Sequence, residues 1–165
     1  MKYSYWELKR IKQLPIKVNS MDAVHAGWHP YHKLKTIGME ALGEQQLQNA
    51  LSAFSGTQSL HKIPLLNTII TDGILYLANT ANCFWLVTDA SVIAKSLMDR
   101  SPFVTVDLKK LSPEKKEALG YEAIIEYSDG NNTILETRKY HLTDFPLERI
   151  RLFFTNNTLM LPSEY

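Results

Sequence analysis

Apolar residues recur at helical spacing in two parts of the chain. Around residues 44–56, the i, i+3, i+4, i+7 pattern of an amphipathic helix is followed by Gly56, a residue suited to capping its end. Residues 83–98 carry a wider apolar stripe, which is formed by Leu86, Ala90, Ile93, Ala94 and Leu97. This stripe predicts the main core helix. Another helical pattern precedes it after an expected turn at Asp72-Gly73, and the two patterns separate near Asn82.

Beyond residue 102 the period of the apolar positions changes to two, which is typical of strands. "FVTVDL" is one predicted strand, and shorter strands are expected at 59–64 and in "TII". Between the later strands, "SPEKKEALG" predicts a short helix with Ser112 as its cap, Pro113 as its first residue and Gly120 as its stop.

Two hairpins are predicted in the last third of the chain, around "SDGNNT" and around "TNNT". Asparagine tolerates the positive φ that such tight turns require. In the first hairpin we expect a ladder of charges in which Glu122 and Glu126 lie near Arg138 and Lys139. Helices followed by hairpins indicate an α+β fold, with N-terminal helices packed on an antiparallel β-meander.

The distribution of charge divides the chain in two. Residues 1–40 hold seven Lys/Arg and three Asp/Glu, a net charge of +4, whereas residues 41–165 hold 11 and 14, a net charge of −3. We therefore predict a basic, aromatic N-terminal arm at 1–40 and a single α+β domain at 41–165. Within the arm, Ser4 and Glu7 fit a capping box, which predicts a basic amphipathic helix that ends before Pro15.

Length and composition favour one globular domain, because 165 residues with 45% hydrophobic content can build a core. The longest apolar runs, such as Cys83–Val87, are far shorter than a membrane-spanning helix, and the first twenty residues are rich in charge where a signal peptide would be apolar. A single cysteine, Cys83, suits a reducing compartment. The expected location is the cytoplasm, with no contact to a membrane.

"HAGWHPYH" gathers three of the five histidines of the chain. His25, His29 and His32 are weak candidates for metal ligands, because Gly27 and Pro30 oppose the helix that would align them and no acidic residue or cysteine lies among them. Interleaved aromatic and basic residues also suit stacking on single-stranded nucleic acid, but a protein contact is favoured because Trp and Tyr often anchor interfaces. The partner-binding candidates are Trp6, Arg10, Lys12, Trp28, His29, Tyr31, Lys33 and Lys35.

The sequence argues against several enzyme classes. It carries none of the glycine-rich phosphate-binding motifs, no G-x-S-x-G and no H-E-x-x-H, and Cys83 lies beside Phe84 and Trp85 rather than beside a base. Carboxylates that could in principle act as acid and base, or hold a hard metal, are Asp72, Asp89, Asp107, Asp144 and Glu148. No catalytic residue, metal site or cofactor is predicted.

Four segments of the sequence resemble an uncharacterised family of small bacterial proteins. They are "TDGILYLA", "FWLV", "TDFPLERIRL" and "LMLPSEY", and the resemblance covers roughly residues 45–165. The family is frequent in cyanobacteria and mobile elements and is known only as a domain of unknown function, so the resemblance implies no activity. It draws attention to Asp72, Gly73, Trp85, Asp144, Pro146, Glu164 and Tyr165.

The sequence therefore favours a non-catalytic binding or accessory protein that acts through protein contacts, using the arm and an exposed face of the sheet. A modulator or inhibitor of a host complex is a narrower hypothesis, which rests on the resemblance alone. Two alternatives stay open: a nucleic-acid-binding protein that uses residues 1–40, and a small metal-dependent hydrolase.

Overall fold

The protein is described by a computed structural model that covers residues 43–165 in detail. Within this range the chain forms a single sheet, four α-helices and one short 3-10 helix. The helices are α1 (Glu44–Ser52), α2 (Asp72–Thr80), α3 (Phe84–Ser96), α4 (Pro113–Leu119) and the 3-10 helix η2 (Pro162–Glu164). The strands are β1 (His61–Ile63), β2 (Thr68–Ile70), β3 (Phe103–Lys110), β4 (Ala123–Ser128), β5 (Ile134–Tyr140), β6 (Arg149–Thr155) and β7 (Thr158–Met160).

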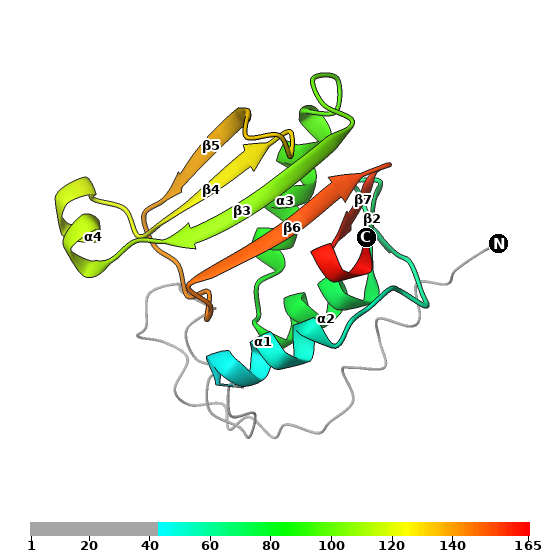
Figure 1. Cartoon of the computed structure of the whole chain (residues 1–165), viewed down its shortest axis with the longest axis horizontal. Helices are drawn as coiled ribbons and strands as arrows, with labels where there is room; N and C mark the ends of the chain where they lie inside the picture. The colour runs from blue at the N-terminus through cyan, green and yellow to red at the C-terminus, as the bar shows by residue number, and fades with distance from the viewer. Residues whose placement is uncertain (1–42) are drawn as a thin grey trace, which may run out of the picture. The chain divides into compact units, whose positions relative to one another are not determined.

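The seven strands lie in the order β1-β2-β7-β6-β3-β4-β5 (Figure 1). The predicted α+β class is confirmed, but the simple antiparallel meander is wrong, because β2 pairs with β7 in parallel, with Ile69 opposite Thr158. The helices are also interleaved with the strands instead of preceding them. The physical reason is that α2 and α3 carry the chain away from β2, so the last strand of the chain fills the place beside it.

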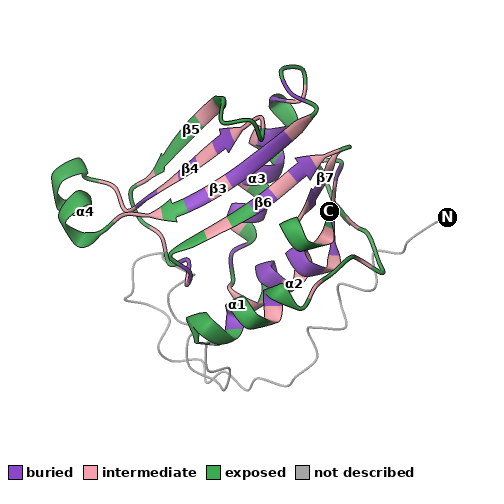
Figure 2. Ribbon diagram, viewed as in Figure 1, coloured by how far each residue is buried: buried purple, intermediate pink, exposed green. Residues whose placement is uncertain are grey.

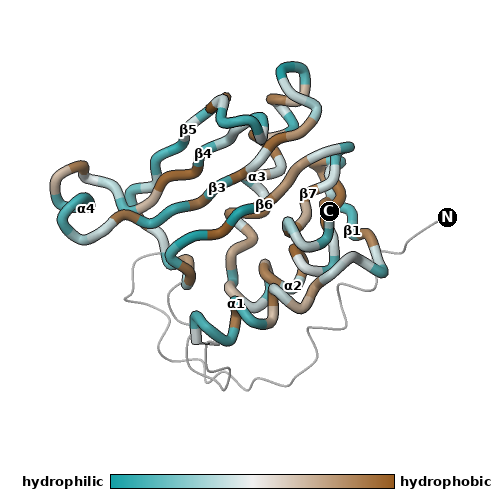
Figure 3. The backbone as a smooth tube through the Cα atoms, viewed as in Figure 1, coloured by the Kyte–Doolittle hydropathy of each residue, from teal (hydrophilic) through white to brown (hydrophobic). Residues whose placement is uncertain are grey.

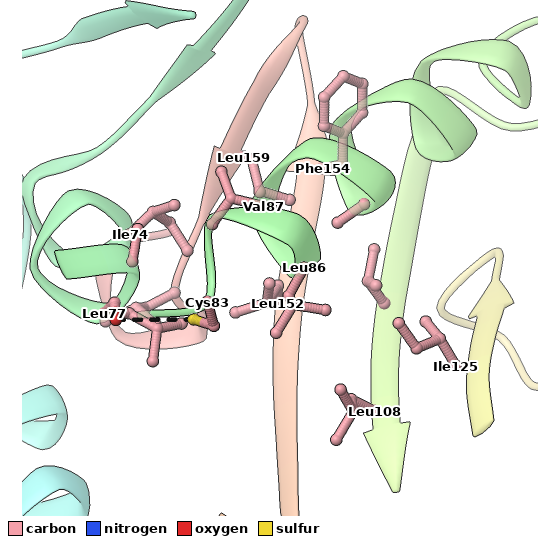
Figure 4. Packing of buried hydrophobic residues seen from close by; sticks show 14 of the residues in the cluster. Ile74, Leu77, Cys83, Leu86, Val87, Leu108, Ile125, Leu152, Phe154 and Leu159 are labelled. Carbon is pink, nitrogen blue, oxygen red and sulfur yellow. Dashed lines mark hydrogen bonds between the residues drawn. The ribbon is translucent and has the colours of Figure 1, made fainter. Parts of the chain in front are cut away.

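Helices α2 and α3 lie on one face of the sheet and supply much of its hydrophobic core (Figures 1 and 2). Alternate residues of the central strands point toward these helices, which the bands of colour along β3 and β6 make visible in Figure 3. Figure 4 shows Leu86 and Val87 of α3 packed near Leu152, Phe154 and Leu159. The predicted core stripe is confirmed at four of its five positions, since Leu86, Ala90, Ala94 and Leu97 are buried while Ile93 is partly buried.

Two predictions, the turn at Asp72-Gly73 and the helix cap at Gly56, are wrong. Asp72-Gly73 is not a turn but the first step of α2, with Thr71 in an extended conformation just before it. An acidic first residue suits a helix start, because the N-terminal N–H groups carry partial positive charge. Gly56 does not cap α1, which ends at Ser52 with Ala53 in the following position.

Other local predictions are confirmed. Helix α4 follows Ser112, begins at Pro113 and ends at Gly120, whose φ of 73° is the left-handed conformation that glycine adopts without strain. The "TNNT" hairpin turns at Asn156 and Asn157, whose φ values are 47° and 60°. In residues 43–165 no helix is both long and apolar enough to span a bilayer.

Candidate binding surface

The face of the sheet opposite α2 and α3 carries rows of charged side chains on its central strands. Asp107 and Lys109 on β3 stand opposite Arg151 and Arg149 on β6, because side chains two apart along a strand share a face. Arg151 binds Asp107 in a two-pronged pair, with Nε 2.7 Å from Oδ1 and Nη2 2.9 Å from Oδ2. This carboxylate raises the pKa of Arg151. Together with Glu126 of β4, these four residues are called the charged rows below.

A hollow of about 350 Å³ lies between β3 and β6. It is lined by four residues of the charged rows, Asp107, Lys109, Arg149 and Arg151, together with Leu108 and Ile150. Arg149 is exposed and makes no hydrogen bond or ion pair with residues 43–165. Its guanidinium group can therefore donate hydrogen bonds to a carboxylate or phosphate of a ligand.

The predicted ladder between β4 and β5 is wrong in its partners. Glu126 pairs with Lys109 of β3, and Arg138 pairs with Glu136 of its own strand at 2.7 Å. The register explains the difference, because it places Thr137 opposite Glu126 and so leaves Glu126 no basic partner directly across on β5. The charge ladder therefore lies over β6, β3 and β4.

An aromatic patch adjoins the charged rows on the same face. The rings of Phe103 and Phe153 lie 5.0 Å apart, and the Tyr165 ring meets them edge-on at 5.4 Å and 5.8 Å. Tyr165 is 74% exposed, so the patch presents an aromatic surface with a hydroxyl group. Phe103, Phe153 and Tyr165 together are called the aromatic patch.

Residues 45–165 match a family described as "Family of unknown function (DUF6876)". The chain belongs to the DUF6876 family. No curated protein and no solved structure matches significantly. The resemblance to a family of unknown function is thereby confirmed over the residues where it was expected, and all four segments that suggested it lie inside the DUF6876 match.

Asp72, in the first DUF6876 segment, ties the loop before β1 to the start of α2. Its carboxylate accepts hydrogen bonds from the backbone N–H groups of Gln58 and Ser59 at 2.8 and 2.9 Å and from the Thr57 hydroxyl at 3.0 Å, and Nε2 of His61 lies 2.7 Å away. These bonds, that from His61 above all, hold the pKa of Asp72 well below its usual range. The arrangement uses the acceptor capacity of the carboxylate for structure.

Gly73 and Glu164 join the first and last DUF6876 segments. The Glu164 carboxylate accepts hydrogen bonds from the Gly73 N–H at 2.9 Å, the Thr71 hydroxyl at 2.6 Å and the Leu161 N–H at 3.1 Å. A Cβ atom at residue 73 would lie 2.5 Å from Cδ1 of Leu161 and 2.6 Å from Oε2 of Glu164, so only glycine fits as the groups now stand. We call these four residues the α2 clasp.

The other two DUF6876 segments also contribute packing. The Trp85 ring lies 5.4 Å from the Tyr140 ring. Asp144 is exposed, and Pro146 stands between Phe145 and Leu147, which are almost fully buried. Of the seven residues singled out in the family segments, only Tyr165 belongs to the surface described above.

The remaining candidates for chemistry do not converge. Cys83 is buried beside the Leu77 carbonyl (Figure 4), and burial raises the pKa of its thiol to about 12. Asp89 accepts a hydrogen bond from the Tyr140 hydroxyl at 3.0 Å, and Glu148 lies 3.7 Å from Lys110. Across residues 43–165 no three His, Cys, Asp or Glu side chains gather as metal ligands would.

The predicted arm lies outside the residues that the structure describes. Its candidates therefore stay predictions: Trp6, Arg10, Lys12, His25, Trp28, His29, Tyr31, His32, Lys33 and Lys35. The charged rows include three residues that the sequence analysis did not select, namely Lys109, Arg149 and Arg151. The usable signal was the alternation of charged and apolar residues in "VTVDLKK" and "ERIRLFF", which predicts a strand with one polar face.

Proposed function

We propose that this protein is a non-catalytic binding protein that contacts another protein through the open face of its sheet. The observation that carries the proposal is the adjacency of the charged rows and the aromatic patch on the face that α2 and α3 leave uncovered. Tyr and Arg are enriched among the residues that dominate binding energy at protein interfaces. The predicted arm would supply further contacts.

The mixture of charges favours a protein over a nucleic acid on this face. Lys109, Arg149 and Arg151 would attract phosphates, but Asp107 and Glu126 lie among them and already bind two of the three cations. A polyanion brought onto this surface would meet both carboxylates at close range. A protein surface can present charges of both signs and so match the rows.

The other functions suggested by the sequence can each be tested separately. Nucleic-acid binding through residues 1–40 predicts an affinity that falls steeply with salt and is lost on replacing Lys9, Arg10 and Lys12. A metal-dependent hydrolase predicts stoichiometric metal after purification. Modulation or inhibition of a host complex is a narrower form of the proposal, and the cytoplasm is the location that we propose for it.

The experiment is a capture of host proteins on the full chain, followed by reconstitution with the purified partner. Arg149→Glu and Tyr165→Ala change exposed side chains of the face, and Lys115→Glu makes the same charge change as Arg149→Glu on exposed α4. We expect the purified partner to bind wild type and Lys115→Glu alike, and to bind both face variants at least tenfold more weakly, which corresponds to about 1.4 kcal/mol.

Two results would contradict the proposal. Binding that is equal in all four proteins would place the contact elsewhere on the chain. A captured species that is nucleic acid and is removed by nuclease would favour the nucleic-acid alternative.

A further inference from the structure

Among residues 43–165, strand β5 pairs only with β4 and so forms one edge of the described sheet (Figure 1). The Tyr140 carbonyl accepts the Glu122 N–H at 2.8 Å, so the backbone of Tyr140 points toward the β4 side. Alternate residues of a strand direct their N–H and C=O groups to opposite sides. Thr137 and Lys139 therefore direct theirs outward, where an additional strand can bind.

The register between β4 and β5 shifts near Leu135, because Tyr127 lies opposite Glu136 while Ser128 lies opposite Ile134. The alternation of directions therefore applies to Glu136–Tyr140, and the Leu135 carbonyl accepts a hydrogen bond from Nη1 of Arg100 at 3.1 Å. A carbonyl oxygen has two lone pairs, so this bond leaves room for a second donor. The outer edge of β5 thus has outward backbone groups at Thr137 and Lys139.

The sequence of β5 is complementary to itself about Thr137. If two copies of Ile134–Tyr140 run antiparallel with Thr137 opposite Thr137, Glu136 of each copy faces Arg138 of the other. The register shift at Leu135 limits this regular pairing to the stretch Glu136–Arg138 around Thr137. No residue meets a like charge directly across. Within one copy Glu136 and Arg138 are already 2.7 Å apart, so pairing would join four charges of alternating sign.

We propose that β5 binds β5 of a second copy of this chain, antiparallel and centred on Thr137, so that one sheet continues across two copies. The two Thr137 residues exchange N–H to C=O hydrogen bonds, and the Glu136–Arg138 pairs fix the register. This edge is separate from the charged rows and the aromatic patch, so the proposal is independent of the proposed function. A dimer would present two open faces.

The dimer is expected to depend on concentration. Stable interfaces bury about 1,200–2,000 Å² in total, and a single pair of seven-residue edges supplies only part of this area. The charged residues of β5 are also well hydrated in the monomer, and charged side chains on edge strands often prevent association. Register and partner choice therefore rest on the complementary charges.

The test is sedimentation velocity of the full chain over a wide range of concentrations. We expect wild type to shift from monomer to dimer as concentration rises. Thr137→Pro removes an N–H that β4 does not use, and proline is tolerated at strand edges, so this variant should stay folded and monomeric. Circular dichroism and the thermal unfolding midpoint check that the fold persists.

A charge-reversal series tests the register itself. Arg138→Glu places two carboxylates opposite each other and should weaken the dimer at least tenfold. Adding Glu136→Arg restores opposite charges across the strands and should restore the dimer, while Lys115→Glu on α4 should have no effect.

Three results would overturn the proposal. They are a wild-type chain that is monomeric at every concentration, a dimer that Thr137→Pro leaves intact, and a double variant that stays as weak as Arg138→Glu. A monomer that instead binds a strand of another protein through this edge would also overturn it, because the occupant would not be a second copy.

Discussion

Replacing Gly73 by alanine would test whether the α2 clasp stabilises the fold. The added Cβ would lie 2.5 Å from Cδ1 of Leu161, 2.6 Å from Oε2 of Glu164 and 2.8 Å from Cδ of Glu164. Both neighbours must move, although each contact involves the end of a side chain. Leu161 is only 3% exposed, and the Glu164 carboxylate is held by hydrogen bonds from three groups.

Three terms set the expected change in the free energy of unfolding, one favourable and two unfavourable. Alanine favours a helix over glycine by about 1 kcal/mol, which stabilises α2. A hydrogen bond to a charged group contributes about 1.5–3 kcal/mol, and moving the Glu164 carboxylate breaks at least one such bond. Displacement of the buried Leu161 adds about 1 kcal/mol. We therefore expect Gly73→Ala to lower the free energy of unfolding by about 2 kcal/mol.

Urea unfolding followed by circular dichroism measures this free energy, and the midpoint of thermal unfolding should fall by about 5 °C. The matched control is Gly73→Ala in a Glu164→Ala background, where two of the three close atoms are absent. There the alanine should cost at least 1 kcal/mol less, since contacting residues are not additive. A Gly73→Ala protein as stable as wild type, or an equal cost in both backgrounds, would refute the reasoning.

Three further changes test single features. The pKa of Asp72 is lowered in the folded state, so its carboxylate stabilises the fold at pH values above about 3.9, its pKa in the unfolded chain. This contribution is lost as the pH falls toward the folded-state pKa. In urea unfolding below about pH 4, the free energy of unfolding should therefore fall less steeply with pH in Asp72→Asn than in wild type. Leu65 is fully exposed with a φ of 73°, so Leu65→Asn should raise the free energy of unfolding by about 1 kcal/mol, whereas Leu60→Asn, also at an exposed leucine, should change it by less than about 0.5 kcal/mol. The buried Ser91 hydroxyl has no hydrogen-bond partner within residues 43–165, so Ser91→Ala should stabilise the protein by about 1 kcal/mol in thermal unfolding, and Ser96→Ala, which removes a bonded exposed hydroxyl, should gain less. Equal effects in each matched pair would contradict these expectations.

Local features of the fold were predictable because short-range forces set them. The caps of α4 depend on residues within a few positions of each other, as do the asparagines of the β6–β7 turn. The same holds for the apolar stripe of α3, whose spacing alone identifies the buried side. An exposed face of the sheet was predicted, but its residues Lys109, Arg149 and Arg151 were not selected.

The sequence by itself determined the α+β class, the main helices and the hairpin turns, because steric and hydrogen-bonding preferences act over a few residues. Only the tertiary structure decided that β2 pairs in parallel with β7, that Asp107 faces Arg151, and that Glu164 reaches the start of α2. The last contact joins residues 91 positions apart. Many arrangements of the chain could bring distant residues together, and the folded one is that which both buries the core and gives its polar groups hydrogen-bond partners. No local sequence pattern encodes that choice.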